Sequence, residues 1–284
     1  MEKSFRYDKD TAVVQTKQGA VHGYEYDGVT VFKGIPYAKA KRFHAPEPAD
    51  PWEGVREATG YGYVCPLLDP ERPDSDLGTP HRVGVQSENC QNLNVWTPAC
   101  DGGKRPVMVW LHGGGFSAGS SMEMVAYEGH SASKYGQIVF VSINHRLNVL
   151  GFCDLSEFGE EYRDSGNAGI ADMVAALQWV HDNIASFGGD PDNVTIFGQS
   201  GGGMKVTALL QTPAADGLFH KGLIMSGVQG GAIFDCVGSG RPIGEMLLKE
   251  AGVSTVKELE EIPYEQLTRA FKWMRSSLRP QKLN

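Results

Sequence analysis

The 284-residue sequence has no long apolar run, no leader pattern and no block of basic residues. No stretch approaches the roughly 18 apolar residues that a membrane-spanning helix needs. The first residues, MEKSFRYDKD, lack the apolar core of a secretory signal. Lys and Arg total 26 against 34 Asp and Glu, a net charge of −8 that argues against a nucleic-acid partner. We therefore expect a cytoplasmic protein that binds neither membrane nor nucleic acid.

Cysteine is scarce, and its five positions show no pairing pattern. They include no CxxC pair and no Cys/His cluster at metal-ligand spacing, so we expect mostly free thiols and no bound metal. The cysteines are Cys65, Cys90, Cys100, Cys153 and Cys236. Glycine is plentiful instead, with 36 residues that cluster in a few places. Clustered glycine indicates special backbone geometry at those places.

The chain begins with short predicted strands and a long irregular loop. The predicted strands occupy residues 12–16, 20–26 and 29–33. Asp27-Gly28, between the last two, is a strong signal for a two-residue hairpin turn. Residues 36–86 are rich in Pro and Gly and show neither helical nor strand period. We expect a small antiparallel β portion followed by a surface loop.

Strands and helices alternate through the rest of the chain. Apolar residues recur at helical spacing from 168 to 187, which predicts a long amphipathic helix. Further predicted strands are 93–96, 106–111, 138–143, 193–197 and 221–225, and further predicted helices are 204–210, 243–251, 255–262 and 264–278. This alternation predicts an α/β fold with a mostly parallel central sheet, in one domain spanning residues 1–284.

The sequence GQSGG at 198–202 lies between a predicted strand and a predicted helix. This is the context of a nucleophile elbow, in which small neighbours allow a serine to occupy a strained strand-to-helix turn. A phosphate-binding loop is the competing interpretation, but that motif needs Lys directly after its second Gly, where Met204 intervenes. We therefore predict that Ser200 is a nucleophile.

A second glycine-rich motif, HGGGF at 112–116, directly follows a predicted central strand. In an α/β-hydrolase fold, a loop in this place donates backbone N–H groups to the oxyanion formed when the serine attacks. A glycine turn that merely connects two elements is the alternative. His112 itself is expected to be structural, because the general base of this fold follows the nucleophile in the chain.

Beyond these two motifs, longer segments match a known family. They are GVTVFKGIPYA (28–38), WEGVREAT (52–59), SENCQNLNVWTP (87–98), INHRLNVLGF (143–152), NAGIADMVAALQWVHDNIASFGGDPDNVTIFGQSGGG (167–203) and GLFHKGLIMSG (217–227). Together they resemble the type-B carboxylesterases, the family of cholinesterases and para-nitrobenzyl esterases. The resemblance implies a serine esterase without metal or organic cofactor. It assigns Ser200 as the nucleophile and the N–H groups of Gly114, Gly115 and Gly201 as the oxyanion hole.

The resemblance also implies contacts of the scaffold. Cys65 and Cys90 stand at the positions of a family disulfide, which a reducing cytoplasm leaves optional. Two ion pairs are implied as well, and both are expected to serve the fold and not catalysis. They are Arg42 with Glu88 and Arg146 with Asp172.

Three residues around the elbow depart from the family pattern. Gln199 stands where Glu usually precedes the serine, and Gly201 stands where Ala usually follows it. Lys205 stands where a small Ser is usual. Without a carboxylate at position 199, we expect weaker stabilisation of a charged catalytic imidazole.

The acid and histidine of a triad are not found after the serine. Both should follow it in the chain, but the only later histidine is His220, which precedes the strands that should come first. We expect the chain to be the N-terminal portion of a catalytic domain whose acid and histidine come from a second polypeptide or a C-terminal part. Such a half-sheet would expose an apolar face, for which the helical tail with Leu267, Phe271 and Met274 offers partial cover.

Three hypotheses about function follow. The first is a serine carboxylic-ester hydrolase that acts on a small-molecule ester. The second is a non-catalytic binding module of cholinesterase-like fold, and Ser200 argues against it because such members generally lack the serine. The third is an inactive, truncated fragment.

Overall fold

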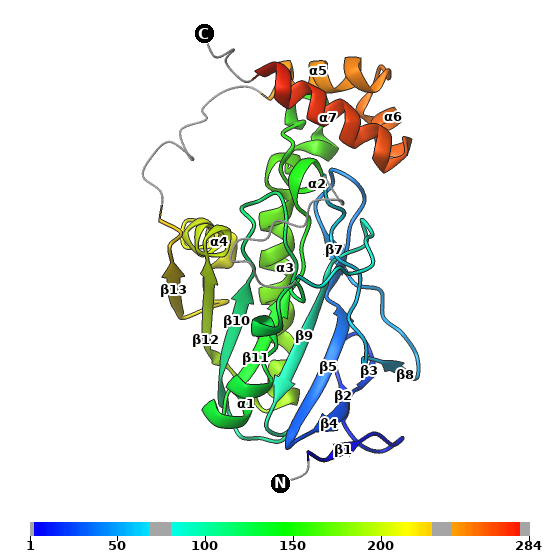
Figure 1. The fold of residues 1–284 in the computed structure, drawn as a ribbon. Helices are drawn as coiled ribbons and strands as arrows, with labels where there is room; N and C mark the ends of the chain where they lie inside the picture. Colours follow the sequence, from blue (N-terminus) through cyan, green and yellow to red (C-terminus); the bar gives the residue numbers. More distant parts are fainter. Residues whose placement is uncertain (1–2, 69–80, 229–239, 279–284) are drawn as a thin grey trace.

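The computed structural model describes residues 3–68, 81–228 and 240–278, which are built around an eight-stranded sheet (Figure 1). In spatial order its strands are β1 (Phe5–Arg6), β4 (Tyr24–Tyr26), β5 (Val29–Pro36), β9 (Asn92–Thr97), β11 (Val139–Ile143), β10 (Arg105–Leu111), β12 (Gly189–Gln199) and β13 (Lys221–Met225). Strands β11, β10, β12 and β13 run parallel to one another, whereas β1, β4, β5 and β9 pair antiparallel. The predicted α/β sheet with an N-terminal antiparallel portion is confirmed.

The N-terminal residues divide between the main sheet and two small sheets. One small sheet contains β2 (Val13–Gln15), β3 (Ala20–His22) and β8 (Val55–Glu57), and the other contains β6 (Ala38–Lys39) and β7 (Glu47–Pro48). The prediction of one strand over 20–26 is wrong, because the chain changes sheet at Gly23. A Cβ there would lie 2.3 Å from the carbonyl oxygen of Val31. The Asp27-Gly28 turn is confirmed, since both residues have the positive φ, 49° and 79°, that a type I′ hairpin needs.

The helices follow the predicted pattern with two additions. The α-helices are α1 (His130–Gly136), α2 (Asn148–Phe152), α3 (Ala168–Asn183), α4 (Gly201–Leu209), α5 (Arg241–Ala251), α6 (Val256–Glu261) and α7 (Tyr264–Leu278). The 3₁₀ segments are η1 (Val125–Tyr127), η2 (Ser156–Phe158), η3 (Glu160–Tyr162), η4 (Ser165–Asn167), η5 (Ile184–Phe187) and η6 (Pro213–Ala215). The sequence pattern missed α1 and α2 because one or two helical turns give too little periodicity to detect.

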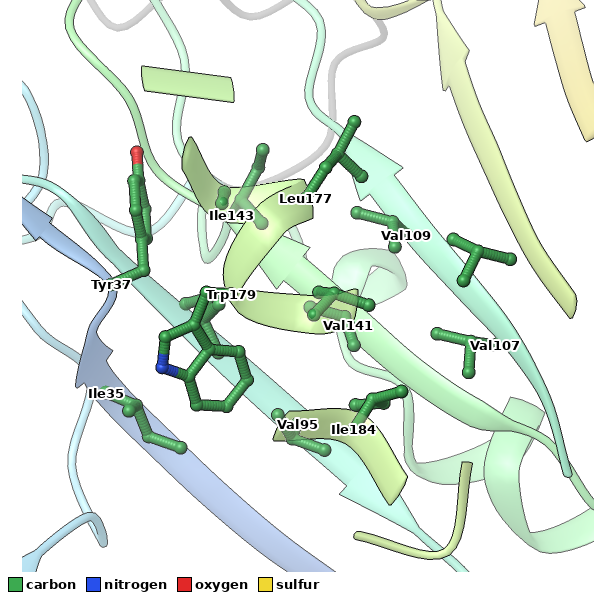
Figure 2. Packing of buried hydrophobic residues seen from close by; sticks show 14 of the residues in the cluster. Ile35, Tyr37, Val95, Val107, Val109, Val141, Ile143, Leu177, Trp179 and Ile184 are labelled. Atoms are coloured by element: carbon green, nitrogen blue, oxygen red, sulfur yellow. The ribbon is translucent and has the colours of Figure 1, made fainter. Parts of the chain in front are cut away.

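The main core lies between α3 and the sheet, as Figure 2 shows. Leu177 of α3 is fully buried in one cluster with Val95, Val109 and Val141, which come from three neighbouring strands. Burying a side chain of this size stabilises the fold by roughly 2 kcal/mol. Strands β10 and β12, which lead to the two predicted motifs, are therefore held by a well-packed core.

The two glycine-rich motifs leave the sheet side by side. Strands β10 and β12 are parallel neighbours, and Leu111 at the end of β10 pairs with Gly198 near the end of β12. Because parallel strands end at the same edge of a sheet, the segments that follow them begin next to each other. The sheet register thus places residues 112–116 beside 199–202.

Helices α5, α6 and α7 pack around a second core cluster near α2 (Figure 1). Leu267 and Met274 of α7 are buried in this cluster. Arg42 holds the end of α6, because its Nη1 donates to the carbonyl oxygens of Leu259 and Ile262, each at 2.9 Å. The described tail therefore packs on the α2 end of the molecule, and the expectation that it covers an open face of the sheet is wrong.

Among the described residues, apolar side chains of the sheet beside β13 are exposed or partly exposed. Among the described residues β13 pairs only with β12, and Phe197 on β12 lies opposite Leu223 on β13. Leu223 is 48% exposed, and Phe197 and Met225 are half-buried. An unpaired edge next to exposed apolar side chains is a surface on which a further strand can pair.

Candidate active site

Ser200 occupies a strained turn between β12 and α4. Its φ of 54° and ψ of −122° lie in a region that residues with a side chain rarely adopt. The backbone N–H of Ser200 donates to the carbonyl oxygen of Met225 at 2.8 Å, which holds the turn against the end of β13. The helix begins at Gly201, three residues before the predicted start, so the serine leads directly into α4.

The glycines of the motif are required by close backbone contacts. A Cβ on Gly198 would lie 2.4 Å from the carbonyl carbon of Gly202. A Cβ on Gly202 would lie 2.1 Å from the carbonyl oxygen of Leu111. Both distances are far inside van der Waals contact, and the atoms involved belong to the backbone. The small neighbours predicted for the elbow therefore allow α4 to start against the end of β10.

We expect Gly202→Ala to lower the free energy of unfolding by about 2–3 kcal/mol, because overpacking against a backbone carbonyl forces the helix away from β10. Gly60→Ala is the matched control, since a Cβ at this exposed glycine meets no atom within 4 Å. Urea unfolding monitored by circular dichroism measures both. Equal stability of the two variants would contradict the close approach of α4 and β10.

The glycine loop after β10 folds against the serine turn. Gly114 and Gly115 both have positive φ, 84° and 62°. The carbonyl oxygen of Gly114 accepts the N–H of Ala118 at 3.1 Å, which closes the loop on itself. A Cβ on Gly201 would lie only 2.2 Å from the backbone nitrogen of Gly115. The structure therefore brings the predicted residues Gly114, Gly115 and Gly201 together with Ser200.

The N–H groups of this corner are available to a ligand. Within the described residues, no hydrogen bond uses the backbone N–H of Gly114, Gly115 or Gly201 as donor. The Ser200 hydroxyl likewise makes no hydrogen bond to a described residue, and its side chain is partly exposed. A hydroxyl and free N–H groups around one turn are suited to hold a developing oxyanion.

No described histidine hydrogen-bonds to Ser200. His220 lies before β13, where its N–H donates to Val194 O at 2.8 Å and its Nδ1 accepts the N–H of Val194 at 3.2 Å. This is the far end of β13 from Met225, whose carbonyl holds the serine turn. His220 therefore serves a strand start, in agreement with the expectation that it is not the base.

A buried polar layer lies under the glycine loop. The rings of His112 and His145 stack with centroids 5.1 Å apart. Each Nδ1 lies 2.8 Å from a backbone carbonyl oxygen, and each Nε2 is buried without a described partner. Burial, with the nearby Lys205 ammonium, lowers the pKa of both histidines well below the usual value, so both rings are neutral at pH 7. The prediction that His112 is structural fits this setting.

We expect the free energy of unfolding to fall as the pH is lowered below about 6.5. The two buried histidines stay neutral in the folded chain, whereas in the unfolded chain they bind protons below their ordinary pKa of about 6.5. Each adds a slope of about 1.4 kcal/mol per pH unit in that range. Urea unfolding between pH 5 and 7 should show a smaller slope for His145→Leu. An unchanged slope there, or an equal loss for the exposed His181→Leu, would contradict this origin.

In the sequence, Lys205 stands out only as a departure from a family pattern. In the structure its side chain is fully buried, and Nζ donates to the carbonyl oxygen of His112 at 2.8 Å. Burial lowers the pKa of Lys205 to about 7. The sequence offers one signal for a special role, a lysine among the small and apolar residues at the start of α4. It does not show which atom accepts the hydrogen bond of this lysine.

Both ion pairs implied by the resemblance are present. Arg146 forms a two-pronged pair with Asp172, with 2.9 Å from Nε to Oδ2 and 2.7 Å from Nη2 to Oδ1. The side chains are 2% and 0% exposed. Arg42 pairs in the same way with Glu88. Both pairs lie in the scaffold, as expected.

The cysteines in the described part of the chain are free thiols, and Cys236 lies outside it. Cys65 and Cys90 are buried neighbours, and a hydrogen bond to Cys65 together with burial raises the pKa of the Cys90 thiol. The structure thus holds the two residues of the implied disulfide in contact but reduced. The described residues also contain no group of three or more His, Cys, Asp or Glu placed to hold a metal ion, and no helix long and apolar enough to span a membrane.

Comparisons with known proteins agree with the family resemblance of the sequence. A family model described as "Carboxylesterase family" matches residues 10–274. The chain is 46% identical over 220 residues to the para-nitrobenzyl esterase of Bacillus subtilis, which covers 76% of this chain and 43% of that protein. It is 38% identical over 264 residues to the phenmedipham hydrolase of Pseudarthrobacter oxydans, which covers 90% and 50%.

Solved structures agree with the fold. An esterase of Clostridium hathewayi, described as hydrolysing aliphatic aromatic polyesters, matches with a TM-score of 0.93 and 53% identity over 97% of this chain and 56% of its own. A carboxylesterase of Geobacillus stearothermophilus matches with a TM-score of 0.80 and 44% identity over 94% and 54%. The present chain spans about half the length of the relatives it matches.

Sheet, elbow and glycine loop together define a protein of the α/β-hydrolase class. Within that class, the chain belongs to the carboxylesterase family.

Proposed function

We propose that the chain carries the nucleophile and the oxyanion donors of a serine carboxylic-ester hydrolase. In this proposal Ser200 is the nucleophile, and the N–H groups of Gly114, Gly115 and Gly201 bind the oxyanion. The observation that carries it is the strained φ of 54° at Ser200 beside a glycine loop whose Gly115 nitrogen would lie 2.2 Å from a Cβ on Gly201. Backbone strain of this kind persists where a function requires it.

The proposed reaction is acyl transfer without a metal or cofactor. The hydroxyl oxygen of Ser200 attacks the ester carbonyl while a base takes its proton, and the three N–H groups stabilise the negative charge on the carbonyl oxygen. The alcohol then leaves with a proton, and an acyl group stays on Ser200. Water attacks this acyl-enzyme in the same site and releases the carboxylic acid.

The acid and histidine are proposed to come from a second polypeptide or from a C-terminal part of the same domain, of which residues 1–284 form the N-terminal portion. Two observations support this proposal. No described histidine bonds to Ser200, and a serine without a base is a weak nucleophile. The edge of β13, which is unpaired among the described residues, and the exposed Leu223 offer a surface for further strands.

The proposed substrates are small-molecule carboxylic esters. The relatives named above are esterases or hydrolases, which supports this substrate class. The acyl and alcohol groups that bind best depend on pocket walls that the described half contributes only in part.

A complementation assay tests this proposal. The purified chain is mixed with the segment of the Bacillus subtilis para-nitrobenzyl esterase that lies beyond the matched region, and hydrolysis of p-nitrophenyl acetate is followed. We expect the mixture to hydrolyse the ester at least about a thousandfold faster than either polypeptide alone, because completing a triad restores the base. Co-elution of the two polypeptides without any gain in rate would contradict the proposal.

A further inference from the structure

Lys205 is an unusual residue to find beneath the predicted site. It lies on the second turn of α4, five positions after Ser200, and its side chain is 0% exposed. Its Nζ makes one hydrogen bond to a described residue, to the carbonyl oxygen of His112 at 2.8 Å. An ammonium group that leaves water for one carbonyl loses much of its hydration energy. The fold therefore gives up stability to keep a lysine there.

The hydrogen bond of Lys205 joins the two segments that form the predicted site. Its own helix starts at Ser200, and the carbonyl it binds belongs to the last residue before the glycines of the donor loop. Lys205 thus connects α4 with residue 112 at the base of that loop. Glycine loops such as 113–115, with positive φ at Gly114 and Gly115, have little stiffness of their own.

We infer that Lys205 is a positioning residue. Its hydrogen bond to the carbonyl oxygen of His112 holds the donor loop, residues 113–115, in place beside Ser200. This inference rests on the proposed function, because it assigns the loop glycines as oxyanion donors. A hydrogen bond from a charged donor is about twice as strong as one between neutral groups, so the ammonium is well suited to fix a flexible loop. The donor loop and the start of α4 then keep a fixed position relative to each other during acyl transfer.

The charged and titratable groups around Lys205 support a role other than ion pairing. No carboxylate lies within salt-bridge distance of its Nζ among the described residues, and the attraction of Glu123 and Cys65 acts at longer range. On the loop side the neighbours are the neutral rings of His112 and His145. Burial lowers the pKa of Lys205 to about 7, so its ammonium form is present below that pH and is lost as the pH rises.

A purely structural lysine and a positioning lysine predict opposite results for Lys205→Met. Methionine has a similar length and no charge, so it fills the same space without the cost of burying an ammonium. For a positioning residue we expect an unfolding temperature that is equal or higher. Within 113–119, we expect at least tenfold faster hydrogen exchange of the Ser117 and Ala118 amides, which donate to the carbonyl oxygen of Gly114. Lys221→Met is the matched control, since Lys221 is exposed and its Nζ donates only to the side chain of Asn193 among the described residues.

The same variants give a functional readout. With the para-nitrobenzyl esterase segment of the complementation assay present to supply the base, the second-order rate constant for labelling by a fluorophosphonate should fall about ten- to a hundredfold in Lys205→Met and stay unchanged in Lys221→Met. A lower unfolding temperature with faster exchange throughout α4 and β10, or a failure to fold, would overturn the inference and make the lysine structural. Unchanged exchange at 113–119 would also overturn it.

A measurement on the unchanged chain completes the test. If the ammonium holds the loop, protection of amides 113–119 should fall between pH 6 and 8.5 relative to the core of β10, after correction for intrinsic exchange. Constant protection would overturn the inference. The Ser200→Ala chain separates this result from the proposed function. Equal labelling of Ser200→Ala and the unchanged chain, each mixed with the segment that supplies the base, rejects Ser200 as nucleophile, whereas the exchange of the loop still decides the role of Lys205.

Discussion

Ser200→Ala is expected to lower ester hydrolysis at least about a thousandfold in any assembly that supplies the base. Removing a serine nucleophile costs up to about a millionfold in a complete triad, and what remains comes from the oxyanion hole and substrate binding. Within the turn at 198–202, Ser200 is the only residue with a hydroxyl, since its neighbours are Gln199 and glycines. Steady-state hydrolysis of p-nitrophenyl acetate measures the loss.

Ser131→Ala is the matched control for this prediction. Ser131 is an exposed serine on α1, the helix that precedes β11, and it lies away from the serine turn (Figure 1). Its removal should leave both the rate and the unfolding temperature unchanged. A Ser200→Ala chain that retains the rate of the Ser131→Ala chain would show that hydrolysis occurs at another group.

Arg146→Met is expected to lower the free energy of unfolding by about 3–5 kcal/mol, because it leaves a carboxylate buried without its partner. Asp172 is 0% exposed and accepts three hydrogen bonds from Arg146, two from the guanidinium and one from the backbone N–H. The guanidinium also donates to the carbonyl oxygen of His44 at 2.7 Å. Urea unfolding at pH 7 measures the change.

Two further variants separate this effect from a general loss of charge. Arg146→Met combined with Asp172→Leu should recover a large part of the stability, since no unpaired charge remains in the core. Arg163→Met removes an exposed arginine that pairs with Glu160 and should cost at most about 1 kcal/mol. A single variant Arg146→Met as stable as Arg163→Met would contradict a structural role of the buried pair.

Local sequence pattern predicted the parts of the fold that have a clear period or a clear turn. The predicted helix at 168–187 agrees with α3 and η5, and the predicted strands at 106–111 and 221–225 agree with β10 and β13. Such elements can be predicted because apolar runs and helical spacing follow from which side chains are buried. The Asp27-Gly28 turn agreed because few residue pairs accept positive φ twice.

The remaining features depend on contacts that no local pattern records. The strand expected at 20–26 divides at Gly23, because residues 20–22 pair with the distant β8 whereas 24–26 pair with β5 in the hairpin. Gly23 fits this change of sheet, since a Cβ there would lie 2.3 Å from the carbonyl oxygen of Val31. The position of the tail depends on Arg42, whose hydrogen bonds to α6 span more than two hundred residues of sequence.

Sequence predicts the members of the candidate site but not the contacts that support them. The elbow and the donor loop carry short motifs with a mechanical reason for each glycine, so Ser200 and the loop glycines can be proposed from sequence, and the structure places them side by side. The hydrogen bond from Lys205 to His112 was not, because a backbone carbonyl as acceptor leaves no mark on the sequence. The stacked His112 and His145 come from two strand ends that only the sheet order brings together.

The central claim is that Ser200 is a nucleophile facing a preformed oxyanion hole. Intact-mass and peptide mass spectrometry of the chain, mixed with the para-nitrobenzyl esterase segment of the complementation assay and then treated with a fluorophosphonate, test it most directly, because the segment supplies the base that Ser200 needs. The account predicts one adduct, located on Ser200, that forms faster than adducts on other serines and is absent from Ser200→Ala. An adduct distributed over exposed serines such as Ser131 and Ser226, with Ser200 unmodified, would contradict it.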